Sequence, residues 1–212
     1  MKHPKAASLW VSTKAFNRQM QWIADRGYTT VTMDAVSALF HPQTGTASLV
    51  GNFKLPAKPV VVTFDDGYSD TYDNAFPLLL SRKQKGVFYV LPGFAGQPGY
   101  ITADQMRKMS GSGMDIGSHT VDHKPLRRLG PLTRVWELTE SRRMLEEILG
   151  KPVRHVCYPY GDYNRFVEMD AQEAGYLTGT TTQRRVATKE WDSFALPRIS
   201  VRERTDLRRI LP

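Results

Sequence analysis

Short apolar runs along this chain alternate with longer segments in which apolar residues recur every three or four positions. The most apolar runs lie at residues 60–63 (Val-Val-Val-Thr), 86–91 (Gly-Val-Phe-Tyr-Val-Leu) and 156–158 (Val-Cys-Tyr). Unbroken runs of this length are typical of strands that are buried on both faces, as in a parallel sheet covered by helices. Further strands are expected at 29–32, 114–117, 177–182 and 194–201.

The segments between these runs have the spacing of amphipathic helices. In the first, Ser12 or Thr13 can cap a helix that places Phe16 and Met20 on one face, and Gly27 ends it. Further helices are expected over 33–40, 74–85, 102–109, 132–149 and 164–174.

Strands and helices alternate throughout, which favours strand–helix–strand units and a parallel sheet. The alternation fits either an open doubly wound sheet or a closed barrel, and in both the functional site lies at the carboxyl ends of the strands. No repeat, linker or low-complexity tract divides the 212 residues. We therefore expect an α/β fold and a single domain over 1–212.

The first candidate chemistry lies where the run at 60–63 leads into Asp65, Asp66 and Gly67. Burial of a carboxylate is unfavourable unless it is paired, hydrogen-bonded or bound to a metal, and two neighbouring carboxylates also repel each other. Gly67 allows the chain to bend so that both can face one pocket. A solvated turn is the alternative interpretation of this segment alone.

The second candidate is a pair of histidines. Residues 118–123 read Ser-His-Thr-Val-Asp-His, and on one helical turn their spacing brings His119 and His123 to the same face. Two histidines and one carboxylate, with an open position for water, form a ligand set for a catalytic divalent metal such as zinc. Such pairs also occur on ordinary surfaces, but here two of only five histidines have this spacing.

A third cluster, Pro-Tyr-Gly at 159–161, follows the run at 156–158. Three strand ends that each carry a polar or conformationally special cluster suggest one active-site rim. Cys157 is the only cysteine, which excludes an internal disulfide. Because it lies within an apolar strand, we interpret it as a packing residue rather than a nucleophile.

Residues 63–68 (Thr-Phe-Asp-Asp-Gly-Tyr), 118–123 and 158–161 (Tyr-Pro-Tyr-Gly) together resemble the first three motifs of the polysaccharide deacetylases. This is carbohydrate esterase family 4, which contains the nodulation-factor deacetylase domain. The resemblance covers about residues 9–202, with the motifs in the right order and spacing. It implies a distorted (β/α) barrel, often with seven strands.

The resemblance also implies the central chemical roles. Asp66, His119 and His123 would hold a divalent metal, with Zn²⁺ expected and Co²⁺, Ni²⁺ or Fe²⁺ as alternatives. Asp65 would be the general base that takes the proton of the attacking water. The cation would polarise the amide carbonyl, lower the pKa of its water and keep Asp65 ionised.

Other roles follow from the same resemblance. The backbone N–H of Tyr160 is the expected partner of the developing oxyanion, and Tyr158 and Pro159 are counted as substrate-binding residues of the same motif. The family places a charged partner near its catalytic base, for which Arg198 is the candidate, with a surface position as the alternative. Trp191 is a candidate for stacking on a sugar ring.

Four residues around the histidines are candidates for supporting roles. Asp115 and Asp122 are expected to orient the imidazoles through hydrogen bonds. Ser118 and Thr120 are expected to cap the turn that carries the histidines, with contact to an acetate oxygen as the alternative.

The general acid is the point of departure from the family. Most members carry a late Leu-x-His segment, but no histidine follows Arg198. Residues 11–16 (Val-Ser-Thr-Lys-Ala-Phe) and 197–199 (Pro-Arg-Ile) resemble instead the poly-β-1,6-N-acetylglucosamine deacetylases, whose acid histidine lies in an N-terminal Tyr-His segment. That segment is absent here, and His3 is the only candidate. We expect it to lie upstream of Met1, and without it the protein would bind metal but turn over slowly.

Charge and targeting signals change this picture little. The formal net charge of +8 favours association with anionic surfaces, and a solvated basic surface is the simpler interpretation. The basic residues are scattered and no nucleic-acid module is recognisable, so no nucleic-acid partner is expected. Neither a transmembrane run nor an apolar signal segment is visible. An extracytoplasmic location (periplasmic, secreted or cell-surface) is implied by the resemblance alone.

The sequence therefore predicts a metal-dependent hydrolase of carbon–nitrogen bonds other than peptide bonds. Its substrate would be the N-acetyl groups of N-acetylglucosamine units in an envelope or biofilm polysaccharide. Two alternatives remain open. The same site would serve an O-acetyl esterase or a small-amide hydrolase, and a chain without an acid would be a glycan-binding or export-accessory protein.

Overall fold

Short parallel strands and the helices between them form a curled α/β structure. The computed structural model describes residues 10–40 and 55–211. The strands are β1 (Thr29–Thr30), β2 (Pro59–Val60), β3 (Thr63–Phe64), β4 (Val87–Val90), β5 (Asp115–Ser118), β6 (His155–Cys157) and β7 (Thr178–Thr180). The α-helices are α1 (Thr13–Asp25), α2 (Met33–Ser37), α4 (Phe76–Ser81), α5 (Ala103–Gly111), α6 (Pro131–Leu149) and α7 (Arg165–Glu173).

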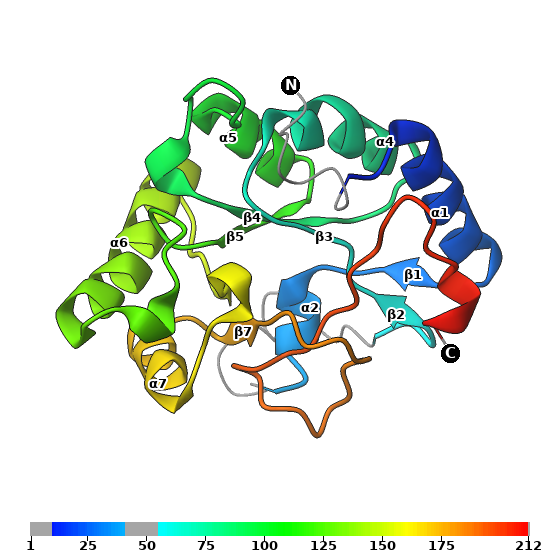
Figure 1. Cartoon of the computed structure of the whole chain (residues 1–212). Helices are drawn as coiled ribbons and strands as arrows, with labels where there is room; N and C mark the ends of the chain where they lie inside the picture. The colour runs from blue at the N-terminus through cyan, green and yellow to red at the C-terminus, as the bar shows by residue number, and fades with distance from the viewer. Residues whose placement is uncertain (1–9, 41–54, 212) are drawn as a thin grey trace.

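The strands form two parallel sheets. Strands β3 to β7 pair in sequence order in a five-stranded sheet, and β1 pairs with β2. Figure 1 shows the strands curled around the middle of the molecule, with α1, α4, α5, α6 and α7 on the outside. This arrangement confirms the predicted α/β class and the distorted barrel, which is a half-barrel. Among the described residues its seven strands fall in one sheet of five and one of two.

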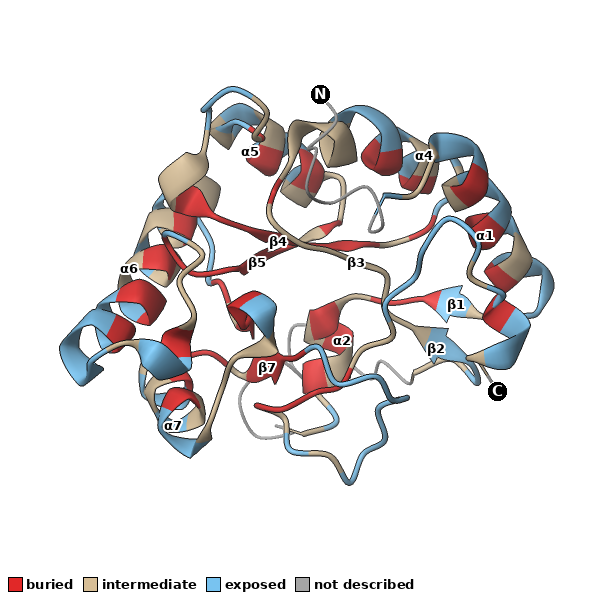
Figure 2. Cartoon of the chain, viewed as in Figure 1, coloured by how far each residue is buried: buried red, intermediate tan, exposed pale blue. Residues whose placement is uncertain are grey.

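Strand β4 shows why the apolar runs belong to this sheet. Its alternate residues Phe88 and Val90 pack in the larger hydrophobic cluster, whereas Val87 and Tyr89 pack in a second, smaller one. Successive side chains of a strand point to opposite faces, so both faces of β4 are covered. Figure 2 shows buried residues along β4, β5 and β7 and on the helix faces turned toward the sheet.

The helix boundaries follow from local capping, as the sequence predicts. Ser12 caps α1 by accepting a hydrogen bond from the backbone of Ala15. Thr102 and Gln105 form a reciprocal capping box at the start of α5. At the end of α6, Gly150 adopts the left-handed conformation with a φ of 65°.

Three expectations about local structure are wrong. The continuous strand at 60–63 is split between β2 and β3, because the first pairs with β1 and the second with β4. The segment expected as a strand at 194–201 pairs with β7 only through a bridge at Leu196. The helix expected over 74–85 starts as a π-helical turn, Thr71–Ala75, which continues into α4.

Lys83, just after α4, supplies a test of backbone strain. Its side chain is exposed and its φ is 55°, in the left-handed region that disfavours a residue with a Cβ. We expect Lys83→Gly to raise the free energy of unfolding by about 0.5–1 kcal/mol, measured by urea denaturation. Lys83→Ala removes the same side chain but keeps the Cβ, so an equal gain in both variants would contradict this account.

Candidate active site

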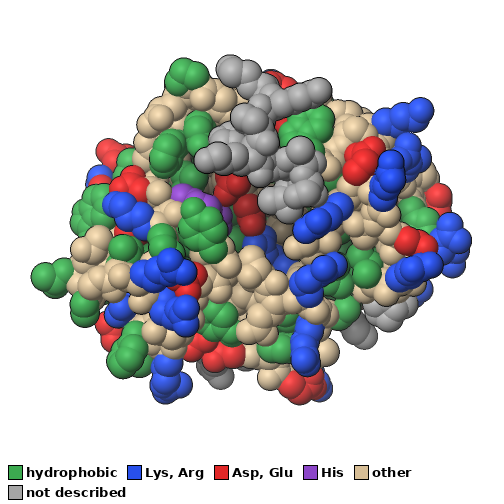
Figure 3. All heavy atoms as spheres, viewed as in Figure 1, with side chains coloured by type: hydrophobic (Ala, Val, Ile, Leu, Met, Phe, Trp, Pro, Cys, Tyr) green, Lys and Arg blue, Asp and Glu red, His purple; other side chains and the backbone are tan. Residues whose placement is uncertain are grey.

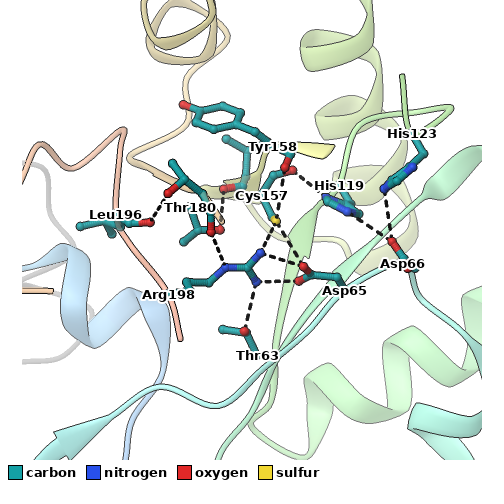
Figure 4. A network of polar contacts seen from close by, with 12 residues as sticks. Thr63, Asp65, Asp66, His119, His123, Cys157, Tyr158, Thr180, Leu196 and Arg198 are labelled. Atoms are coloured by element: carbon teal, nitrogen blue, oxygen red, sulfur yellow. Dashed lines mark hydrogen bonds and ion pairs between the residues drawn. The ribbon is translucent and has the colours of Figure 1, made fainter. Parts of the chain in front are cut away.

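The carboxyl ends of β3, β5 and β6 bring the three sequence motifs together. Asp65 and Asp66 follow β3, His119 and His123 follow β5, and the Pro-Tyr-Gly turn follows β6. Since these strands are parallel, their carboxyl ends lie at one edge of the sheet. Figure 4 shows Asp66 facing both histidines, and Asp65 facing Arg198 from the segment beyond β7.

Asp66 and the two histidines converge on one point. The Oδ1 atom of Asp66 lies 3.3 Å from Nε2 of His119 and 3.3 Å from Nε2 of His123. The three candidate ligand atoms all lie within 4.8 Å of one another. His119 is buried, whereas Asp66 and His123 are partly open to solvent.

The tautomer of His119 tests whether this group fits a cation. Its Nδ1 lies 2.7 Å from the carbonyl oxygen of Cys157, which can only accept, so Nδ1 carries the proton. In the neutral ring, the lone pair on Nε2 then faces the Asp66 carboxylate. Two acceptors repel at this distance unless a proton or a cation lies between them. Two imidazoles and a carboxylate are also the protein ligands of a catalytic zinc site, so the residues fit a divalent cation.

The pKa values of the two histidines differ in direction. Burial disfavours the charged form of His119, but Cys157 and Asp66 outweigh this effect and raise the pKa of His119 well above its usual value. Burial and the neighbouring His119 lower the pKa of His123. A proton can therefore occupy the position between His119 and Asp66, and a bound metal has to displace it.

The expectation that the histidines share a helical turn is wrong. Residues 119–123 form an irregular loop, in which Thr120 and His123 have φ values of 69° and 58°. Asp66 and Tyr160 likewise have positive φ values, of 72° and 60°. Among the described residues, four of the five non-glycine residues with positive φ thus lie in the three motifs. Such strain persists only where the surrounding structure holds it in place.

Arg198 lies against the proposed base. Its guanidinium donates two hydrogen bonds of 2.7 Å to the two carboxylate oxygens of Asp65, and a third of 3.1 Å to Thr63. Burial alone would raise the pKa of Asp65, but Arg198 outweighs it and lowers that pKa to about 2. Asp65 is therefore ionised at neutral pH before any metal is present.

Cys157 is buried as expected, but it also contacts this ion pair. Its Sγ lies 3.0 Å from a guanidinium nitrogen of Arg198 and 3.6 Å from Oδ2 of Asp65. The sequence interpretation treated Cys157 only as a packing residue. The two residues that it contacts are distant in the sequence, since Asp65 follows β3 and Arg198 lies beyond β7. The residues next to Cys157 in the sequence therefore give no indication of these contacts.

Tyr160 has a side-chain contact that the motif did not predict. Its hydroxyl lies 3.1 Å from Nδ1 of His123, and the two rings pack edge to face at 4.6 Å. The following Gly161 is required by close packing, since a Cβ there would lie 2.1 Å from the hydroxyl of Thr182. The phenol of Tyr160 therefore touches a candidate metal ligand, while its strained backbone shapes the turn.

The remaining candidate substrate residues lie mostly below the surface. Pro159 and Tyr158 are buried, and the Tyr158 ring stacks on Tyr163. Trp191 is partly buried and packs against the smaller hydrophobic cluster. Sugar contacts by these three residues stay predictions. His3 lies outside the described residues.

The expected imidazole-orienting roles of Asp115 and Asp122 are wrong. Asp115 begins β5, at the far end from the histidines, and accepts hydrogen bonds from the backbone of Met33 and Asp34. Asp122 pairs with Lys124. The imidazoles are instead oriented by the Cys157 carbonyl and the Tyr160 hydroxyl. Ser118 does cap the loop, since its hydroxyl accepts a hydrogen bond from the backbone N–H of Thr120.

The site is open to solvent in the middle of one face. Figure 3 shows histidine and acidic side chains in a hollow of this face, with lysine and arginine side chains around it.

Among the described residues, no helix is long and apolar enough to cross a membrane.

Known proteins are similar to this chain in sequence and in fold. The family model of the polysaccharide deacetylases matches residues 53–179. YxkH of Bacillus subtilis (strain 168), named as a candidate polysaccharide deacetylase, is 32% identical over 194 residues, which are 92% of this chain and 66% of YxkH. The poly-β-1,6-N-acetyl-D-glucosamine N-deacetylase of Staphylococcus aureus is 22% identical over 205 residues, which are 90% of this chain and 67% of that protein.

A solved structure agrees over the whole chain. The Streptococcus pyogenes deacetylase PplD, determined in complex with acetate, matches with a TM-score of 0.88 and 27% identity, over 100% of this chain and 93% of that chain. The chain belongs to the polysaccharide deacetylase family, whose members are hydrolases. It spans about two thirds of the length of the curated relatives it matches.

The Asp65–Arg198 pair predicts a specific pH dependence of stability. The folded-state pKa of Asp65, about 2, is below its ordinary value of 3.8. The stability that its ionised form contributes is therefore present above pH 3.8 and is lost as the pH falls toward 2. We expect Arg198→Met to lower the free energy of unfolding of the metal-free protein by about 2 kcal/mol at pH 7, measured by urea denaturation.

The difference between Arg198→Met and the wild type should shrink as the pH is lowered from 4 toward 2. Arg127 is a matched control, because it also pairs with an aspartate, Asp162, but is more than half exposed. Arg127→Met should therefore cost less than about 1 kcal/mol. A loss in Arg198→Met that is the same at every pH would contradict the assignment.

Proposed function

We propose that this protein is a metal-dependent N-deacetylase that releases acetate from N-acetylglucosamine units of a polysaccharide. The observation that carries the proposal is the convergence of Asp66, His119 and His123 beside an aspartate that Arg198 keeps ionised. A ligand set with open positions and an adjacent base are the two parts that metal-assisted hydrolysis of an amide requires.

Two relatives support the choice of substrate. The Streptococcus pyogenes deacetylase holds acetate, the product that this reaction would release. The Staphylococcus aureus relative is named for poly-β-1,6-N-acetyl-D-glucosamine, a polymer of N-acetylated units. From the same kinship we propose an extracytoplasmic enzyme that acts on an envelope or biofilm polysaccharide.

The proposed reaction uses the two aspartates differently. A divalent cation held by Asp66, His119 and His123, with Zn²⁺ the expected ion, would supply polarisation of the acetamide carbonyl and acidification of a water molecule. Asp65 takes the proton of that water as it attacks the carbonyl carbon. Arg198 fixes the carboxylate of Asp65 through its paired hydrogen bonds, and so keeps it ready to accept the proton.

Two further groups complete the reaction. The backbone N–H of Tyr160 donates a hydrogen bond to the oxyanion that forms when water attacks. The carbon–nitrogen bond then breaks, the amine of the sugar takes up a proton, and acetate leaves. We propose that a histidine donates this proton, and His3, which lies outside the described residues, is the candidate within this chain.

The proposal is tested by metal analysis combined with acetate release from oligomers of β-1,6-linked N-acetylglucosamine. We expect about one divalent ion per chain and release of acetate by the wild type. His119→Ala should lose both the metal and the activity. Asp65→Asn should keep the metal and lose at least about 100-fold in rate, because it removes the proposed base.

The chain offers a matched control for Asp65→Asn. Asp34 is also a partly exposed aspartate with an arginine partner, Arg154 at 3.6 Å, but it lies in α2 and contacts His155 at the opposite end of β6. Asp34→Asn should leave the rate of acetate release within about threefold of the wild type. Deacetylation that is unaffected by both Asp65→Asn and His119→Ala would rule out the mechanism. If acetate were released only from O-acetyl esters, the enzyme would be an O-acetyl esterase and the proposed N-acetyl substrate would be wrong.

A further inference from the structure

A buried carboxylate on α6 contacts the loop that carries the two histidines. Glu137 has no exposed surface, and its Oε2 accepts hydrogen bonds from the backbone N–H groups of Val121, at 2.9 Å, and Asp122, at 3.1 Å. Its Oε1 lies 3.1 Å from Nζ of Lys124. Since a buried carboxylate is unfavourable unless such partners satisfy it, this position serves the loop rather than the helix.

The contacts of Glu137 fall in the part of the loop that lies between the histidines. Three successive N–H groups, those of Thr120, Val121 and Asp122, all donate to side chains that pack beneath the loop. The first donates to the hydroxyl of Ser118, and the other two donate to Glu137. Hydrogen bonds to side-chain oxygens, rather than a helix or a strand, therefore fix the backbone between His119 and His123.

Helix α6 supports the loop at a second point. The hydroxyl of Ser141, one turn beyond Glu137, accepts a hydrogen bond of 2.8 Å from Ser118. The turn after β4 contacts the loop as well, since Gly93 packs so closely that a Cβ there would lie 2.7 Å from the carbonyl oxygen of Val121. The loop therefore packs against both α6 and the turn after β4.

These contacts have to compensate for strain in the backbone of the loop. Thr120 and His123 both adopt the left-handed conformation, which costs about 1–2 kcal/mol for each residue with a Cβ. Released from Glu137, the loop could relax toward ordinary φ values. Because His123 itself is one of the strained residues, its imidazole would then turn away from Asp66 and His119.

We infer that Glu137 is a positioning residue that sets the geometry of the metal site by holding the His119–His123 loop. The inference rests on the metal site of the proposed function. Glu137 touches neither the candidate ligand atoms nor the substrate position, and it acts through the two backbone N–H groups. The two backbone hydrogen bonds require reach and not charge, because a neutral oxygen at the place of Oε2 can accept both of them. The charge of Glu137 serves the separate contact of Oε1 with Lys124.

The test compares the affinity of the protein for Zn²⁺ in three Glu137 variants, by competition with a chromogenic chelator. Glu137→Gln keeps an acceptor oxygen at full reach and should bind Zn²⁺ within about threefold of the wild type. Glu137→Asp keeps the charge but withdraws the carboxylate by one methylene, and should lose about tenfold. Glu137→Leu removes the acceptor and should lose about 10- to 100-fold.

Glu146 provides a control for general destabilisation of α6. It too accepts a hydrogen bond from a backbone N–H, that of Val153 at 3.0 Å, but far from the histidines. Glu146→Leu should leave the Zn²⁺ affinity unchanged. Hydrogen exchange gives a second readout: the amides of Val121 and Asp122 should exchange at least tenfold faster in Glu137→Asp, and not in Glu146→Leu.

The outcomes separate this inference from the proposed function. A wild type that binds no Zn²⁺ would reject both. If the wild type binds Zn²⁺ and Glu137→Asp binds it as tightly as Glu137→Gln, only the positioning role is rejected. This pair decides the matter even if Glu137→Leu does not fold. An equal loss in Glu146→Leu would also reject the role, because it would trace the effect to the helix as a whole.

Discussion

Two adjacent carboxylates at the end of β3 impose the main constraint on this molecule. Both face the same partly closed site, where like charges repel strongly, and the structure separates them by giving each a different counterpart. Asp65 pairs with the guanidinium of Arg198, and Asp66 faces the imidazoles of His119 and His123. The division gives them different roles in the proposed reaction, since Asp65 is the proposed base and Asp66 is a candidate metal ligand.

The scaffold around this edge is arranged to hold strained backbone. The sheet is buried on both faces, by the helices outside and by the smaller cluster within. That burial supplies the stability against which the left-handed residues of the motifs are held. Asp66, Thr120, His123 and Tyr160, which have positive φ values, all lie in the segments that follow the strands at this edge. The rigid strand ends therefore hold the strained loops of the site in place.

The imidazoles are oriented by a backbone carbonyl and a hydroxyl group rather than by carboxylates. Metal-binding histidines often donate their second N–H to a carboxylate, which makes the ring a stronger ligand. Here His119 donates to the Cys157 carbonyl, and His123 contacts the hydroxyl of Tyr160. The acidic residues near the loop are used elsewhere, with Glu137 bound to its backbone. We therefore infer that the geometry of the candidate metal site depends more on the backbone of the loop than on acidic residues hydrogen-bonded to the rings.

The sequence by itself determined the class of fold and the residues that meet. Apolar runs, helical periodicity and capping residues act over a few neighbouring positions, so β4, α1 and α5 could be predicted from them. The three motifs contain the candidate metal ligands and the proposed base. Tertiary structure alone decided how these groups are held: the bidentate contact of Arg198 with Asp65, the sulfur of Cys157 beside it, and the buried Glu137. These contacts join residues far apart in the chain, and only the packing of the whole sheet sets their distances.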